Sequence, residues 1–159
     1  METNQYFEDS KVIFNDIIQE LGNIQIDNIK KFTFSGISTY AKIIKVYDGD
    51  TATIIFKHNN EYIKLNCRIN GIDAPEIKSK ILNEKNMANH AKLFLQNIIL
   101  NQIVFIKFYD FDKYGRPLVD IIINYNNNYK SISNIMISGG VARKYDGGHK
   151  DEWITNFNL

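Results

Sequence analysis

Short turns between strand-like segments are the feature of this sequence that most limits how it can fold. The residue pattern of Lys31–Tyr47 is strand-like and is broken by Gly36. The turn Asp48-Gly49-Asp50 separates it from a second predicted strand over Thr51–Lys57. His58-Asn59-Asn60-Glu61 has the composition of a hairpin turn, and a third strand is predicted over Tyr62–Ile69. Because connections this short join antiparallel neighbours, the sequence predicts a three-stranded meander.

Helical periodicity follows, and then two further strands. A helix is expected over Glu84–Ile99, where apolar side chains at helical spacing form a stripe that we expect to be buried. The members of this stripe are Met87, Ala91, Phe94, Leu95 and Ile98. The remaining predicted elements are strands over Gln102–Tyr109 and Leu118–Asn124, a turn at Asn126-Asn127-Asn128, a short helix over Ser131–Ser138 and an extended piece over Val141–Tyr145.

The order of these elements predicts the fold class. Three strands in a meander, a helix, two more strands and a final helix is the order of an OB-type barrel. We therefore expect a mainly β, α+β protein built on a five-stranded OB-fold barrel, with about three helices in all.

A separate helix is predicted ahead of the barrel. Ser10–Leu21 has helical spacing, with Ser10 in the N-cap position and Gly22 as the stop signal. We therefore expect an N-terminal extension over residues 1–31 and a barrel domain over residues 32–159. The apolar face of this helix packs within the protein, which is the simpler account, or it contacts a partner. That face comprises Phe14, Ile17 and Leu21.

Composition limits the class of protein. With 159 residues, 44% of them hydrophobic and 23% charged, the chain has the balance of one folded globular domain. It has no apolar run long enough to span a membrane, and its acidic, polar start does not resemble a secretory signal. Cys67 is the only cysteine, so we expect no internal disulfide and a reducing, intracellular and cytoplasmic location. A net charge of +1 provides no general attraction to nucleic acid or membranes, and we expect a monomer without membrane contact.

Three polar clusters interrupt the predicted strands. They are Asp48-Gly49-Asp50-Thr51, Arg68 followed by Asp73-Ala74-Pro75-Glu76, and Asp112-Lys113-Tyr114-Gly115-Arg116. Taken singly, each is typical of a solvated turn or loop. Each nevertheless lies at the end of a strand, and a barrel exposes such ends on one rim. We therefore expect the three clusters to meet.

Together, these residue types are suited to the hydrolysis of a phosphodiester. Two carboxylates from different loops make an all-oxygen site for a hard cation such as Ca²⁺, and a third carboxylate nearby can take a proton from a water molecule. Two guanidinium groups can clamp phosphate oxygens in a bidentate manner, which lysine does poorly. Only three of the 19 basic residues are arginine, and two of them, Arg68 and Arg116, lie in these clusters. Such a set stabilises the charge that develops on phosphate when water attacks it.

With these clusters in their observed order, the sequence resembles the staphylococcal nuclease (thermonuclease) family. The resemblance spans about residues 32–153. It is carried by Val46-Tyr47-Asp48-Gly49-Asp50-Thr51, Arg68-Ile69-Asn70-Gly71-Ile72-Asp73-Ala74-Pro75-Glu76 and Asp112-Lys113-Tyr114-Gly115-Arg116. It implies an OB-fold, Ca²⁺-dependent nuclease that hydrolyses DNA, RNA or both, with the 5′ oxygen leaving and a 3′-phosphate end remaining.

The resemblance also implies a role for individual residues. Asp50 and Asp73 match the carboxylate ligands of Ca²⁺, and Ala74 matches a position that binds the metal through its backbone carbonyl. Glu76 matches the general base, and Arg68 and Arg116 match the arginines that hold the scissile phosphate. The residues that match or resemble substrate contacts are Lys113, Tyr114 and Tyr145.

The main alternative is an OB-fold nucleic-acid-binding module with weak or no catalysis, which would not need all five catalytic and metal-binding side chains. Other residues carry weaker signals. Cys67 is expected to pack in the core, and Gly147-Gly148 to form a turn or a loop that approaches phosphate. The remaining candidates are His58, His90 and His149, expected at the surface, and Lys78, Lys80 and Lys85, in a solvated loop or at a substrate entrance.

Overall fold

The chain divides into two compact units, residues 1–32 and 33–159. The computed structural model describes residues 14–125, 127–150 and 152–153. Within the first unit, residues 14–22 are helical and are followed by the short 3-10 helix η1, Ile26–Asn28. The predicted N-cap Ser10 lies outside the described residues, and Gly22, the predicted stop signal, is the last helical residue. None of the described helices has the length and the apolar composition needed to cross a membrane.

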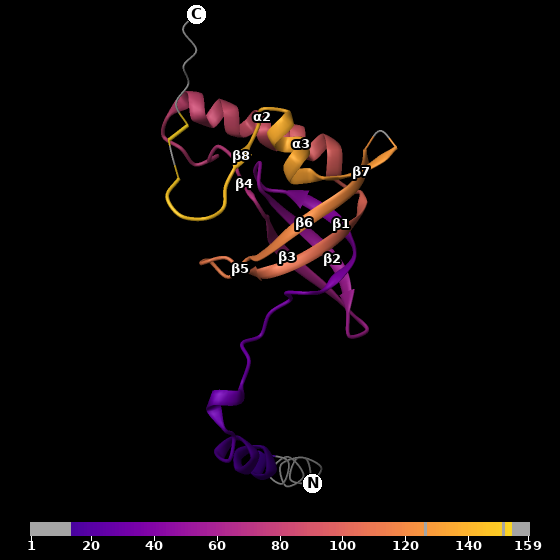
Figure 1. Cartoon of the computed structure of the whole chain (residues 1–159), viewed down its shortest axis with the longest axis vertical. Coiled ribbons are helices and arrows are strands. Elements are labelled where there is room, and N and C mark those ends of the chain that lie inside the picture. The colour runs from indigo at the N-terminus through magenta and orange to yellow at the C-terminus, as the bar shows by residue number, and fades with distance from the viewer. Residues whose placement is uncertain (1–13, 126, 151, 154–159) are drawn as a thin grey trace, which may run out of the picture. The chain divides into compact units, whose positions relative to one another are not determined.

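The second unit is a closed five-stranded β-barrel, as predicted. Its strands are β1 (Ser38–Val46), β2 (Thr51–His58), β3 (Glu61–Ile69), β5 (Ile103–Phe111) and β6 (Pro117–Tyr125). Neighbours in the order β3-β2-β1-β5-β6 are antiparallel, and a parallel pairing of β3 with β6 closes the barrel (Figure 1). In that pairing Arg68 lies opposite Leu118, so the end of β3 is brought beside the start of β6.

Two helices and two very short strands complete this unit. Helix α2 (Leu82–Ile99) and helix α3 (Ile132–Ser138) lie over one end of the barrel (Figure 1). A sixth strand, β7 (Asn128–Ser131), extends the sheet beyond β6. Strands β4 (Ile72–Asp73) and β8 (Arg143–Lys144) pair with each other as a separate two-stranded ribbon.

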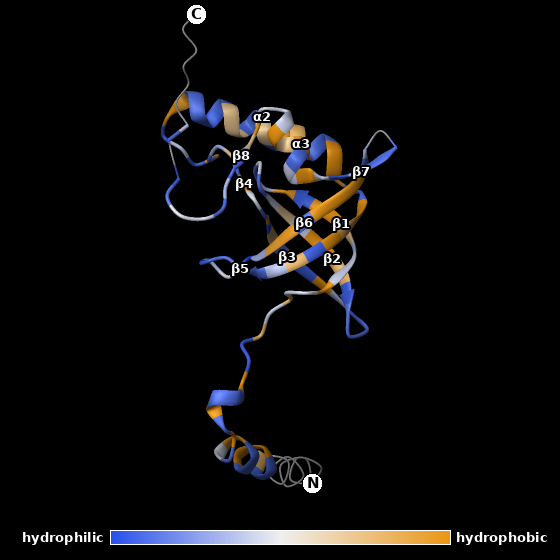
Figure 2. Ribbon diagram, viewed as in Figure 1, coloured by the Kyte–Doolittle hydropathy of each residue, from blue (hydrophilic) through white to orange (hydrophobic). Residues whose placement is uncertain are grey.

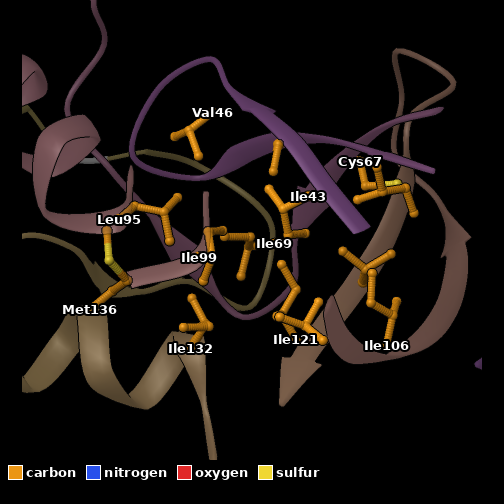
Figure 3. Close-up of a cluster of buried hydrophobic side chains, with 14 of the residues drawn as sticks. Ile43, Val46, Cys67, Ile69, Leu95, Ile99, Ile106, Ile121, Ile132 and Met136 are labelled. Carbon is orange, nitrogen blue, oxygen red and sulfur yellow. The ribbon is translucent and has the colours of Figure 1, made fainter. Parts of the chain in front are cut away.

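The core is formed by side chains of the barrel strands and continues to the buried faces of the two helices. Figure 3 shows side chains from barrel strands and from both helices meeting there, among them Ile43, Cys67, Leu95 and Met136. Hydrophobic residues are concentrated along the strands, whereas the turns between them are hydrophilic (Figure 2). Cys67 is fully buried, as expected, and this burial raises the pKa of its thiol to about 12. On α2, the buried side chains are Ala88, Ala91, Leu95 and Ile99, while Phe94 and Ile98 are partly buried against the core.

The first strand begins later than the sequence predicts. Residues 31–37 do not belong to β1, although Phe34 is buried against Phe56 and Phe108. Gly36 has a φ of 88°, and the Ile37 N–H donates to the Phe34 carbonyl at 3.0 Å, so a turn interrupts the segment. Residues 31–37 therefore have the hydrophobic pattern of a strand but do not form a continuous strand.

The turn at residues 48–50 is tightly packed against α2. A Cβ placed on Gly49 would lie 2.6 Å from the Cβ of Ala74 and 2.8 Å from that of Ala91. Glycine is needed here for close approach, because only a residue without a side chain leaves room for the helix. The same contact holds Asp48 and Asp50 at the end of the barrel that α2 covers.

Candidate active site

The three predicted clusters line one open pocket of about 1230 Å³. It is bounded by the ends of β1, β3 and β5 and by the segment after β8. Asp73 and Ala74 do not line it, because both are buried beneath its wall. The predicted site residues that do line the pocket are Asp50, Arg68, Glu76, Lys113, Tyr114, Arg116 and Tyr145.

Asp50 is buried at the base of the pocket, in the turn between β1 and β2. Its Oδ1 accepts a hydrogen bond from Thr51 Oγ1 at 2.8 Å, and its backbone N–H donates to Asp48 Oδ1 at 3.1 Å. Burial raises the pKa of Asp50 to about 7, and the nearby Asp48 carboxylate adds to the rise, while Arg68 opposes it. Asp50 therefore exchanges its proton near neutral pH and not in the acidic range usual for an aspartate.

The raised pKa of Asp50 predicts how the stability of the cation-free protein depends on pH. A folded-state pKa above the ordinary value of 3.8 means that the folded protein binds the proton more tightly. The free energy of unfolding should therefore fall as pH rises from about 4 to about 7, by an amount on the order of a few kcal/mol. Urea denaturation in chelator across this range measures the change, and Asp50→Asn should flatten it. Parallel profiles for the two proteins would contradict this assignment.

Arg68 joins two of the predicted carboxylates. It lies at the end of β3, and its Nη2 is 3.0 Å from Asp50 Oδ2 and 3.7 Å from Asp73 Oδ1. The same nitrogen donates to the Ile72 carbonyl at 3.1 Å. The two carboxylates, which belong to different clusters, therefore face a common point.

Asp73 is held in place by basic side chains. Pairing of β4 with β8 sets Asp73 opposite Arg143, and the Asp73 side chain is 1% exposed. Arg143 donates from Nη2 at 2.9 Å and from Nε at 3.2 Å, both to Asp73 Oδ2. Lys150 Nζ lies 2.6 Å from Asp73 Oδ1, an ion pair that lacks the alignment of a hydrogen bond.

Glu76 is exposed at the mouth of the pocket. Its Oε1 accepts from Lys150 Nζ at 2.9 Å, and the side chain remains 57% exposed. Its backbone N–H donates to Glu84 Oε1 at 3.3 Å, and Glu84 also accepts from Ser79 Oγ at 2.5 Å. The first turn of α2 therefore fixes the backbone beside Glu76 and leaves its carboxylate facing the pocket.

Arg116 is oriented by the hairpin that joins β5 and β6. Its Nε donates to Asp112 Oδ2 at 2.7 Å, and its Nη1 donates to Thr51 Oγ1 at 3.1 Å. Burial raises the pKa of Asp112, but hydrogen bonds from Arg116 and the Tyr114 backbone outweigh it and lower the pKa. Because Thr51 also donates to Asp50, one chain of hydrogen bonds connects Arg116 with the turn at residues 48–50.

Two tyrosines lie over the arginines. The Tyr114 ring centroid is 5.6 Å from Arg116 Cζ and 5.1 Å from Lys113 Nζ, and this side chain is 72% exposed. The Tyr145 ring centroid lies 5.7 Å from Arg68 Cζ, and its hydroxyl donates to the Gly148 carbonyl at 2.8 Å. Each arginine is thus paired with an aromatic ring on the pocket wall.

Arg143 and Lys150 are site residues that the sequence analysis did not identify. Both contact Asp73, from 70 and 77 positions along the chain, and no local pattern reports such a pairing. One signal was present for Arg143, because arginine is rare in this lysine-rich chain and a guanidinium suits a bidentate contact with a carboxylate. Lys150 had no comparable signal.

Several weaker candidates can also be placed. Lys78, His149, Gly147 and Gly148 line the pocket, whereas Lys80 and Lys85 do not. His90 is exposed, as expected, and His58 is half-buried with its ring 5.8 Å from that of Phe34.

The two carboxylates that contact Arg68 fit a hard cation. Over residues 14–125, 127–150 and 152–153, no three His, Cys, Asp or Glu side chains form a ready-made metal cluster. Asp50 and Asp73 nevertheless face the same Arg68 nitrogen, and Asp73 Oδ1 is a buried oxygen without a hydrogen bond. Two carboxylates are suitable oxygen ligands for such an ion.

Comparison with known proteins places the chain in a family. It is 31% identical over 153 residues to an uncharacterized protein of Methanocaldococcus jannaschii, covering 84% of this chain and 68% of that protein. It is 30% identical over 98 residues to a probable endonuclease of Nakaseomyces delphensis, covering 62% and 38% of the two chains. A family model described as staphylococcal nuclease homologue matches residues 66–156. Since this match covers more than half of the sequence, the chain belongs to the family of staphylococcal nuclease homologues.

Proposed function

We propose that this protein is a Ca²⁺-dependent nuclease that hydrolyses phosphodiester bonds of DNA, RNA or both. One observation carries the proposal: two guanidinium groups and one exposed carboxylate, those of Arg68, Arg116 and Glu76, line a single pocket. Membership of the family supports the same conclusion, as does the similarity to a probable endonuclease. A protein that only bound nucleic acid would have no need for an exposed carboxylate beside its phosphate-binding arginines.

Asp50, Asp73 and the backbone carbonyl of Ala74 are the groups that would hold Ca²⁺. Once bound, the cation supplies positive charge that favours ionised water and stabilises charge on phosphate oxygens. The raised pKa of Asp50 makes this binding dependent on pH, because the carboxyl must lose its proton to become a ligand. We therefore expect the affinity for Ca²⁺ to increase as pH rises through about 7.

The protein's own residues divide the hydrolytic step between them. Glu76 accepts a proton from the attacking water, whose oxygen forms the new bond to phosphorus. Arg68 and Arg116 bind the phosphate oxygens and stabilise the charge that grows on them. The bond to the 5′ oxygen breaks, this oxygen takes a proton from solvent to become a hydroxyl, and a 3′-phosphate remains. Lys113 and the rings of Tyr114 and Tyr145 contact the rest of the nucleotide, and exposed rings can stack on bases.

A binding module without catalysis is the second candidate function. The observation in its favour is that the carboxylates proposed as cation ligands are paired with Arg68, Arg143 and Lys150. An arrangement of this kind could hold phosphate through the same basic side chains without cleaving it.

Cleavage of end-labelled single-stranded DNA and RNA with Ca²⁺, with Mg²⁺ and with chelator tests the proposal. We expect cleavage with Ca²⁺ and none with chelator, because without the cation the phosphate charge lacks its main counter-charge. The products should carry 3′-phosphate ends. A folded protein that binds these strands without cutting them would support the binding module instead, and cleavage that survives chelator would contradict the role of the cation.

A further inference from the structure

Lys150 places a positive charge between two carboxylates of the site. Its Nζ lies 2.6 Å from Asp73 Oδ1 and 2.9 Å from Glu76 Oε1. These are the carboxylates to which the proposed function assigns cation binding and proton transfer. An ammonium group on a flexible side chain therefore already provides the charge that a bound cation would bring.

The contacts of Asp73 show which of its oxygens a metal ion would need. Arg143 occupies Oδ2 with two nitrogen atoms, at 2.9 and 3.2 Å. Only Oδ1 faces Arg68 Nη2, the atom that Asp50 also contacts. Oδ1 is thus the ligand oxygen on the side of Asp50, and it is the oxygen that Lys150 contacts. A divalent cation and the Lys150 ammonium cannot both lie against it, because their charges repel at such short distances.

The segment that carries Lys150 is attached at both ends and at one point between them, where the Tyr145 hydroxyl donates to the Gly148 carbonyl at 2.8 Å. At one end the Tyr145 N–H donates to the Gly71 carbonyl at 3.0 Å, and at the other Arg143 Nη1 donates to the Glu152 carbonyl at 3.4 Å. Between them lie Gly147 and Gly148, with φ of 94° and 97°. Adjacent glycines in this conformation absorb backbone rotation with little strain, so Lys150 can withdraw while both ends stay attached.

We propose that Lys150 is a built-in counter-cation, which neutralises Asp73 and Glu76 in the cation-free protein and is displaced when a divalent cation binds. This inference rests on the proposed function, since it concerns the same cation site. It couples cation loading to a rearrangement of the 145–150 segment, which forms part of the pocket wall. The divalent cation then binds in competition with a charge that the chain itself supplies.

Calorimetric titration of the full chain with CaCl₂ tests this competition, with Lys150→Gln as the variant and Lys144→Gln as its matched control. Lys144 lies in β8, directly before this segment, and its side chain is 76% exposed. Among the described contacts it pairs only with Asp146, at 3.4 Å, so Lys144→Gln changes the net charge by the same amount. Lys150→Gln should bind Ca²⁺ about tenfold more tightly. This factor is expected if the arrangement in which Lys150 contacts Asp73 is about 90% populated in the unmodified chain without Ca²⁺. Lys144→Gln should bind as the unmodified chain does.

Trp153, the only tryptophan, provides a second readout that does not depend on activity. Trp153 follows Lys150 by three residues, and its ring centroid lies 4.4 Å from Arg143 Cζ. Arg143 contacts both Trp153 and Asp73, so the departure of Lys150 from Asp73 should alter the surroundings of the ring. Ca²⁺ should therefore change Trp153 fluorescence in the unmodified chain and change it much less in Lys150→Gln, where no displacement is needed.

The outcomes separate this inference from the proposed function. Equal Ca²⁺ affinity in the unmodified chain and Lys150→Gln, or an equal gain in both variants, would overturn the inference and leave Ca²⁺ dependence standing. Weaker binding by a Lys150→Gln protein that unfolds at the usual temperature would also overturn it, because Lys150 would then support the site. Both proposals fail if neither the unmodified chain nor either variant releases or absorbs heat on titration with CaCl₂ and cleavage persists in chelator.

Discussion

Replacing Glu76 by glutamine is expected to lower the turnover number by about 10²–10⁴-fold, the range typical of a lost general base. The amide has the size of the carboxylate but cannot take a proton from water. Glu76 is 57% exposed and none of its contacts belongs to the core, so the variant should fold and unfold like the unmodified protein. The substitution should therefore slow the chemical step and leave the stability of the fold unchanged.

Single-turnover cleavage of labelled single-stranded DNA at saturating Ca²⁺ and saturating protein measures this effect directly. Under these conditions substrate binding no longer limits the rate, so the rate constant reports the chemical step. Asp146→Asn is the matched control: it also removes one exposed carboxylate from the pocket wall, where Asp146 pairs with Lys144 at 3.4 Å. We expect the control to cleave at the unmodified rate. Unchanged cleavage by Glu76→Gln would remove Glu76 from the mechanism.

The barrel could be predicted because residues close together in the sequence determine its strands and turns. The strands between Thr51 and Ile69 alternate or run apolar between short turns, and the hydrophobic pattern alone sets which side chains enter the core. The late start of β1 was missed because Phe34 retains a core position while Gly36 turns the backbone. A pattern of hydrophobic residues reports burial, and it reports backbone conformation only indirectly.

The site was predictable only in part, for the same physical reason. Asp50, Arg68 and Arg116 lie at strand ends, so knowing the fold class was enough to expect them on one rim. The pairing of β4 with β8 and the contacts of Lys150 depend on segments about 70 residues apart, which meet only after the barrel and its helices have assembled. The short strand β7 was missed likewise, because its four residues gain their hydrogen bonds from β6.

Replacing Arg116 by lysine is expected to lower the turnover number by about 10²–10³-fold, the loss typical of removing one donor to the developing charge. The guanidinium contacts Asp112 through Nε and Nη2, both at 2.7 Å, and Thr51 through Nη1 at 3.1 Å. A planar group with several donors can keep these contacts while it also binds phosphate. An ammonium has a single nitrogen and must give up one set of contacts for the other.

Asp112→Asn separates the geometry of Arg116 from its charge. Asparagine retains an acceptor for the backbone N–H groups of Tyr114 and Arg116 but weakens the charged contact that orients the guanidinium. We expect a smaller loss of turnover than in Arg116→Lys, since the five donors remain and only their orientation is relaxed. Asp112→Asn should also reduce stability above about pH 4, because the lowered pKa of Asp112 stabilises the fold where the carboxyl is ionised.

The comparison of turnover with KM decides between binding and catalysis for Arg116. If the guanidinium holds phosphate equally in the ground and transition states, Arg116→Lys will raise KM and leave turnover unchanged. If it acts mainly on the charge that develops during attack, turnover will fall while KM changes little. We expect the second result, because the bond from Thr51 to Asp50 connects Arg116 to the proposed cation site and fixes its donors before substrate arrives. If Arg116→Lys has the turnover number and KM of the unmodified protein, Arg116 only stabilises the hairpin between β5 and β6 and takes no part in binding or cleavage.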